Sequence, residues 1–214
     1  MPLLALHVGP VWPALAWVCL SLTGTPLRAE SIQSARFAEP VSRYGHFALG
    51  RPHEYARLTV TTNCGRELTL QLPEDEVFED LVPRIVRLAA GEPDQILAIV
   101  SQRHIGGTLK VYRQEGDALR EIAALAGFSN HVYGSAELGW SAPAVRAGRA
   151  VLLVPDSLRR WLHAVALDGG KLADQGRCAL PETATGALEI DDDGGVSIGL
   201  ASGLRHRVTG DCLN

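Results

Sequence analysis

Three consecutive carboxylates beside two glycines are the residues of this chain best suited to hold a metal ion. They are Asp191, Asp192 and Asp193, and Gly194 and Gly195 follow them. Carboxylate oxygens are the ligands that calcium prefers, and calcium needs about six to eight of them. However, neighbouring residues of a strand point to opposite faces, and Asp-Gly is a strong hairpin-turn signal. The pattern therefore favours a turn, leaves these three acids as the only calcium candidates, and predicts no bound cofactor.

Histidines are the second group that could do chemistry, because imidazole serves as a general base or a metal ligand near neutral pH. His53 precedes Glu54, but no Gly-x-Ser-x-Gly elbow supplies a nucleophile, and His163 lies among the polar positions of an alternating stretch. We therefore predict structural roles for the histidines and no catalytic residue. The alternative, an exported hydrolase or lyase, requires one pocket formed by His46, His53, Glu54, His104 and His131.

Aromatic side chains could form a binding surface for a carbohydrate or a peptide. The candidates are Trp140, Trp161, Tyr44, Tyr55, Tyr112 and Tyr133. Aromatic residues at strand ends more often pack in the core, so packing is the favoured interpretation. The two arginines before Trp161 are expected in an exposed turn.

The first 29 residues contain no Asp, Glu or Lys and carry apolar runs ahead of Ala29. This composition predicts a secretory signal peptide over residues 1–29, cleaved after Ala29. An uncleaved membrane anchor is the alternative, but Pro10 and Pro13 interrupt a stretch that is shorter than the roughly 20 apolar residues of a spanning helix. We therefore expect a periplasmic or secreted protein with no stable membrane span after cleavage.

Export would place Cys64, Cys178 and Cys212 in a compartment that permits disulfides. An odd count allows at most one bridge and leaves one unpaired thiol. Cys178 and Cys212 are the preferred pair, because both lie beside turn residues in the last third of the chain. Their spacing matches no zinc motif.

A pattern that repeats along the chain indicates the strands and turns on which these candidate residues lie. An apolar run, a short turn, an alternating run and a Gly-containing turn occur over residues 96–122 and 151–171, and more weakly over 186–208. Repeats of this size are typical of stacked units or propeller blades. Residues 56–61 and 67–72 predict an opening hairpin with a turn at 62–65, whereas residues 30–40 show little periodicity and are interpreted as an entry segment.

Short strands and glycine turns throughout predict one all-β domain over residues 30–214. Residues 121–126 are rich in Ala and Leu, but glycines bracket too short a run for a stable helix, so a strand is expected there. The net charge is −4, with acids and bases mixed along the sequence. No basic stripe is interleaved with aromatics, which disfavours nucleic-acid binding.

Several short motifs occur in a fixed order at residues 43–46, 78–81, 83–86, 91–94, 107–112 and 129–131. In these motifs and their order, the chain resembles exported bacterial proteins with FG-GAP or VCBS-type repeats. The resemblance, which spans most of the chain after the leader, implies antiparallel β-propeller blades like those of the integrin α head. It also implies Asp- and Gly-rich calcium loops, yet the corresponding stretches here, 86–94 and 143–149, lack most of the required acids.

Three clear units and a possible fourth lie at or below the lower end of the range of about four to eight blades that propellers typically use. The sequence therefore predicts an incomplete or minimal propeller-like fold with degenerate calcium loops. The expected function is that of a non-catalytic binding or interaction module, with an envelope protein or another ligand as partner. A truncated relative without activity is a third alternative, which missing blades would favour.

Overall fold

A computed structural model describes residues 31–37, 57–71, 84–86, 88, 96–103, 106–130, 139–209 and 211–213. Contacts divide the chain into residues 1–30 and residues 31–214, and the described residues all belong to the second unit. The predicted signal peptide and its cleavage after Ala29 lie outside the described residues.

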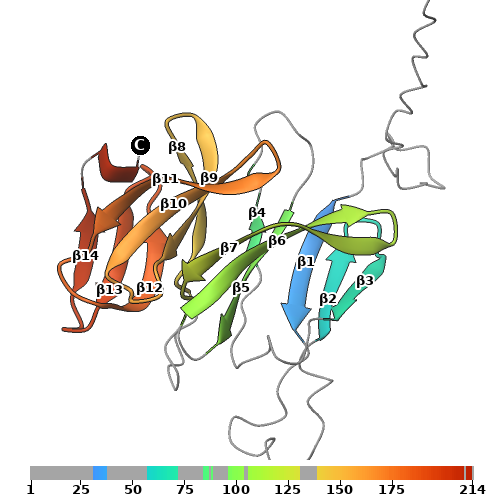
Figure 1. Cartoon of the computed structure of the whole chain (residues 1–214), viewed down its shortest axis with the longest axis horizontal. Coiled ribbons are helices and arrows are strands. Elements are labelled where there is room, and N and C mark those ends of the chain that lie inside the picture. Colours follow the sequence, from blue (N-terminus) through green and yellow to red (C-terminus); the bar gives the residue numbers. More distant parts are fainter. Residues whose placement is uncertain are drawn as a thin grey trace, which may run out of the picture. The chain divides into compact units, whose positions relative to one another are not determined.

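The described residues form fourteen strands in four antiparallel sheets, and the strands of each sheet pair in the order in which they occur along the chain (Figure 1). The first sheet contains β1 (Ile32–Phe37), β2 (Arg57–Thr62) and β3 (Glu67–Gln71). The second contains β4 (Arg84–Val86), β5 (Ile96–Arg103), β6 (Gly106–Glu115) and β7 (Ala118–Phe128).

The third sheet contains β8 (Ala142–Arg146), β9 (Arg149–Pro155), β10 (Trp161–Asp168) and β11 (Lys171–Ala179). The fourth contains β12 (Ala184–Ile190), β13 (Val196–Leu200) and β14 (Arg205–Val208), followed by a short 3-10 helix, η4 (Asp211–Leu213). Because every sheet is built from consecutive strands, each one is a simple meander. All three predicted repeats coincide with these sheets, and residues 121–126 form a strand as predicted.

The predicted opening hairpin is also present, as β2 and β3. Its turn contains Gly65 at φ 76°, a left-handed conformation that favours glycine. The segment interpreted as an entry segment with little periodicity contains a strand, because Ile32–Phe37 forms β1 and pairs antiparallel with β2. A shift of register between Ile32 and Ser34 interrupts the alternation of side chains, which explains why periodicity did not reveal this strand.

Three buried clusters join neighbouring sheets, and β9 contributes to two of them. Val151 and Leu153 belong to the cluster shared with the fourth sheet, whereas Leu152 and Val154 belong to the cluster shared with the second. The strand is therefore covered on both faces, which accounts for its continuous apolar run. The remaining cluster joins the first and second sheets through residues such as Leu58 and Tyr112.

The fold is all-β, with propeller-like antiparallel blades, as the sequence predicts. Within the part of the chain that the structure describes, no buried cluster connects the first sheet with the fourth. The described sheets therefore do not form a closed ring, and each core is shared only by sheets that are neighbours in the sequence.

Candidate functional site

The three acids of the sequence-predicted calcium candidate lie at the turn between β12 and β13. Asp191 accepts a hydrogen bond from the backbone N–H of Gly195, and its Oδ2 lies 3.0 Å from Nη2 of Arg207 on β14. A Cβ at Gly195 would come within 3 Å of the ends of the Asp191 and Arg207 side chains, so both side chains would have to shift to admit it. The carboxylate of Asp191 therefore closes a hairpin turn and binds a cation of the protein itself.

Asp192 and Asp193 are exposed at the same turn. Among the described residues, no group of three or more His, Cys, Asp or Glu side chains is arranged to hold a metal ion. The turn predicted for this segment is present.

A different group of side chains lies together on one face of the third sheet. Leu162 and Ala164 of β10 point into the cluster shared with the fourth sheet, so the alternate residues Trp161 and His163 project from the opposite face. The neighbouring strand β11 adds Asp174 and Arg177 to this face, and the end of β7 adds Phe128. We call these five residues the Trp161 face.

A bulge in β11 gives the Trp161 face its geometry. Val165 pairs with Asp174 and Ala164 pairs with Gly176, so Gln175 is an extra residue without a partner in the register. Such a bulge bends the strand and redirects its side chains. It allows Asp174 to reach the side chain of His163, although the direct cross-strand neighbour of His163 is Arg177.

Trp161 and Arg177 form the exposed part of this face. Trp161 keeps 38% of its surface exposed, and the guanidinium carbon of Arg177 lies 4.9 Å from the centre of its ring. This distance is within the range of a cation–π interaction. Among the described residues, no carboxylate forms an ion pair with Arg177, so its guanidinium hydrogen-bond donors remain available.

His163 and Asp174 form a less exposed pair beside them. Nδ1 of His163 lies 2.9 Å from Oδ2 of Asp174, and the other carboxylate oxygen accepts a hydrogen bond of 3.2 Å from the backbone N–H of Gly176. The ring of Phe128 meets the imidazole edge-on at 5.6 Å. Asp174 therefore fixes the orientation of the imidazole.

Backbone hydrogen bonds hold Phe128 beside this pair. The N–H of Ser129 donates to the carbonyl of Pro155 at 3.0 Å, and the N–H of Ser157 donates to the carbonyl of Gly127 at 2.8 Å. These bonds join the end of β7 to the turn between β9 and β10. The Trp161 face is thus assembled from two sheets that are packed against each other.

The other tryptophan of the described residues has a different role. Trp140 is fully buried, and the guanidinium carbon of Arg159 lies 5.9 Å from its ring centre. Tyr112 is also buried, in the core between the first two sheets. Packing was therefore the correct prediction for Trp140 and Tyr112, whereas for Trp161 it was wrong, because this ring is exposed next to an arginine.

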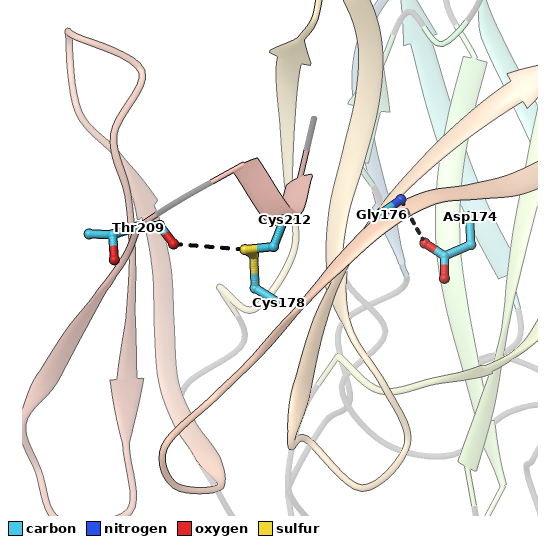
Figure 2. The surroundings of a disulfide bond; sticks show 5 residues. All are labelled: Asp174, Gly176, Cys178, Thr209 and Cys212. Carbon is cyan, nitrogen blue, oxygen red and sulfur yellow. Dashed lines mark hydrogen bonds between the residues drawn. A yellow bond between two sulfur atoms is a disulfide. The ribbon is translucent and has the colours of Figure 1, made fainter.

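The predicted disulfide joins Cys178 of β11 to Cys212 of η4, with their Cα atoms 5.2 Å apart (Figure 2). The carbonyl oxygen of Thr209 lies 3.8 Å from the sulfur of Cys212. A Cβ on Gly176 would come within 2.6 Å of the Cys212 carbonyl oxygen, so only glycine lets the C-terminal segment lie this close to β11. The bulge and the disulfide therefore share one short stretch of β11.

Cys64, at the turn between β2 and β3, is also disulfide-bonded. The expectation of one unpaired thiol was therefore wrong for the described cysteines. Disulfides form and persist mainly in oxidising environments, so the Cys178–Cys212 pair is compatible with an oxidising compartment outside the cytoplasm.

The remaining sequence candidates lie outside the described residues. They are His46, His53, Glu54, His104, His131, Tyr44, Tyr55 and Tyr133. In the described ranges, no helix is long and apolar enough to cross a membrane.

Sequence reasoning named Trp161 as a candidate but gave no sign of its partner. Arg177 lies on the next strand, and only the register of β10 against β11 brings the two together. An exposed aromatic residue at the start of a strand, directly after two arginines, was the available signal.

No protein-family model matches the chain, and no curated protein is significantly similar to it.

Proposed function

We propose that this protein is an exported, non-catalytic binding module of the FG-GAP/VCBS-like repeat type, and that it contacts its ligand through the Trp161 face. The observation that carries the proposal is the exposed Trp161 with the uncompensated Arg177 stacked over its ring. Tryptophan and arginine are the residues most enriched among those that dominate binding energy at interfaces.

Part of this pair lies outside the packing of the third sheet, because Trp161 keeps 38% of its surface exposed and Arg177 is exposed. The core beneath it is formed by residues such as Leu152 and Val165, and these are buried without help from the exposed part of Trp161. An exposed indole ring gains free energy when a ligand removes it from water. An arginine without a carboxylate partner likewise gains from an anionic or polar ligand.

The proposed location is the periplasm or the exterior of the cell. Support comes from the leader-like composition of residues 1–29 and from the disulfide between Cys178 and Cys212. A covalent link of this kind persists where thiols are not kept reduced. The partner would then be a component of the cell envelope or its surroundings.

Co-sedimentation with washed envelope fractions of the source cells tests the proposal. The full chain is compared with Trp161→Ala, Arg177→Gln and the control Lys171→Gln. Lys171 is exposed at the other end of β11, so its variant removes the same charge from the same strand. We expect Trp161→Ala and Arg177→Gln each to weaken binding by about tenfold, the typical effect of an interface residue of this kind, and Lys171→Gln to leave it unchanged.

Circular dichroism melts of all four proteins show whether each variant remains folded. Equal sedimentation of the wild type and both Trp161-face variants would contradict the proposal. The proposal would also be contradicted if Lys171→Gln weakened binding as much as Arg177→Gln, because the effect would then depend only on the loss of a positive charge.

A further inference from the structure

We infer that the Trp161 face binds an acidic saccharide, in which one face of a sugar ring stacks on Trp161 and a carboxylate of the same ring pairs with Arg177. This inference rests on the proposed binding function and names the class of its ligand. It is carried by three features of the same face: an exposed indole ring, an unpaired guanidinium and a partly exposed carboxylate.

The indole ring supplies the first contact. The face of an aromatic ring carries partial negative charge, whereas the C–H bonds on one side of a pyranose ring carry partial positive charge. Trp161 keeps 38% of its surface exposed beside the Arg177 guanidinium that lies over its ring, and this exposed part of the indole matches a sugar ring better than a fully polar ligand. Of the two tryptophans in the described residues, only Trp161 can serve in this way, because Trp140 is buried.

Arg177 supplies the charge recognition. Its planar guanidinium offers parallel N–H donors that fit a carboxylate in a bidentate manner. The stacking on Trp161 holds the side chain near the position of the sugar ring, so less side-chain entropy is lost on binding. A neutral sugar would leave this cation without a counter-charge, and this is why the face favours an acidic one.

Asp174 supplies an acceptor for hydroxyl groups and limits the charge of the ligand. Its carboxylate accepts hydrogen bonds from His163 and Gly176, and its side chain is 37% exposed, so lone pairs remain available to the ligand. Sugar hydroxyls donate to such an acceptor. The same negative charge would repel a phosphate dianion or a densely sulfated chain, so the face favours one carboxylate for each sugar ring.

Fluorescence titration of the full chain with uronic acid trisaccharides tests the inference. Each acid is compared with its methyl ester, which keeps the shape of the sugar and removes its charge. We expect the acids to change tryptophan emission and to bind at least tenfold more tightly than the esters. Trp161→Phe should abolish the change in emission, which assigns the signal to this ring.

Variants of Arg177 then test whether the carboxylate of the saccharide pairs with this side chain. Arg177→Gln should weaken binding of the acids by about tenfold and leave binding of the esters unchanged, because only the acids pair with the guanidinium. Arg177→Lys should restore only part of the affinity, since lysine lacks the planar fork. The control Lys171→Gln should bind acids and esters like the wild type.

Three results would overturn the inference. Acids and esters could bind equally well, Arg177→Gln could weaken both alike, or none of the trisaccharides could bind. If envelope co-sedimentation still depends on Trp161 in any of these cases, the binding function stands and the ligand class is wrong. A peptide rich in Asp and Glu that binds through Trp161 in place of the trisaccharides would identify a protein partner instead.

Discussion

At the scale of single residues, the turn at Asp191 shows how a metal-like sequence is used for a structural purpose. Asp191 bonds to the backbone of its own turn and to Arg207 on the next strand but one. The carboxylate thus stabilises the hairpin through a backbone N–H and a guanidinium of the protein itself.

We therefore predict that chelation of calcium with EGTA leaves the melting temperature of the protein unchanged. In contrast, Asp191→Ala removes the hydrogen bond to Gly195 and the ion pair with Arg207, and should cost about 1 kcal/mol of unfolding free energy, because both interactions are largely exposed. Urea unfolding measures the second effect. As the matched control, Asp192→Ala at the same exposed turn should change stability by less than Asp191→Ala. A sharp fall in melting temperature on chelation would contradict this prediction.

At this scale, the sequence-based predictions were correct where the residues next to each candidate carried the signal. The turn at Asp191 depends on residues adjacent in the chain, and the pairing of Cys178 with Cys212 was inferred from turn residues beside both. The Trp161 face could not be predicted, since it depends on which residue of β11 lies beside Trp161. The extra residue Gln175 shifts that register by one, and single sequences carry no clear signal for such a bulge.

At the scale of elements, alternation and glycine turns were sufficient to place most strands. They identified β2 and β3, the repeated strands of the second and third sheets, and the weaker copy that forms β12 to β14. They failed for β1, where the bulge after Ile32 breaks the period of two. Tertiary pairing with β2, which supplies partners for the backbone of β1, decides its structure.

The disulfide is the element that fastens the fourth sheet to the third. It closes a segment of 34 residues that contains all three strands of the fourth sheet. We predict that the double variant Cys178→Ala and Cys212→Ala loses about 4 kcal/mol of unfolding free energy, chiefly because the unfolded chain is no longer constrained. Urea unfolding monitored by circular dichroism measures this loss.

The single variant Cys212→Ala provides the control for this experiment. It breaks the same bond but keeps the buried side chain of Cys178, so its difference from the double variant isolates the packing contribution of that side chain. Stability that is unchanged in both variants would show that the bond does not restrict the unfolded chain as proposed.

At the scale of the whole described molecule, the three cores are shared only between neighbouring sheets. The third sheet is covered on both faces, whereas the fourth takes part in a single cluster. In such an arrangement, stability is approximately a sum of local terms, and terminal units open most readily. The disulfide reinforces one of these terminal units.

We predict that hydrogen exchange will reveal this difference. In the variant Cys178→Ala and Cys212→Ala, backbone amides of β12, β13 and β14 should exchange markedly faster than in the wild type, whereas those of β9 should change much less. Mass spectrometry of peptides from both regions measures the effect. A uniform acceleration in all four sheets would instead indicate that the domain opens as one cooperative unit.

The order of the sheets along the chain also has a consequence for biosynthesis. Each sheet is complete as soon as its own consecutive strands have emerged, and it can then pack on the sheet made just before it. Cys212 follows β14, so its bond to Cys178 can close only after all three strands of the fourth sheet have been synthesised. Formation of this bond therefore marks the completion of the fourth sheet, and until then the partner sulfur of Cys178 is missing.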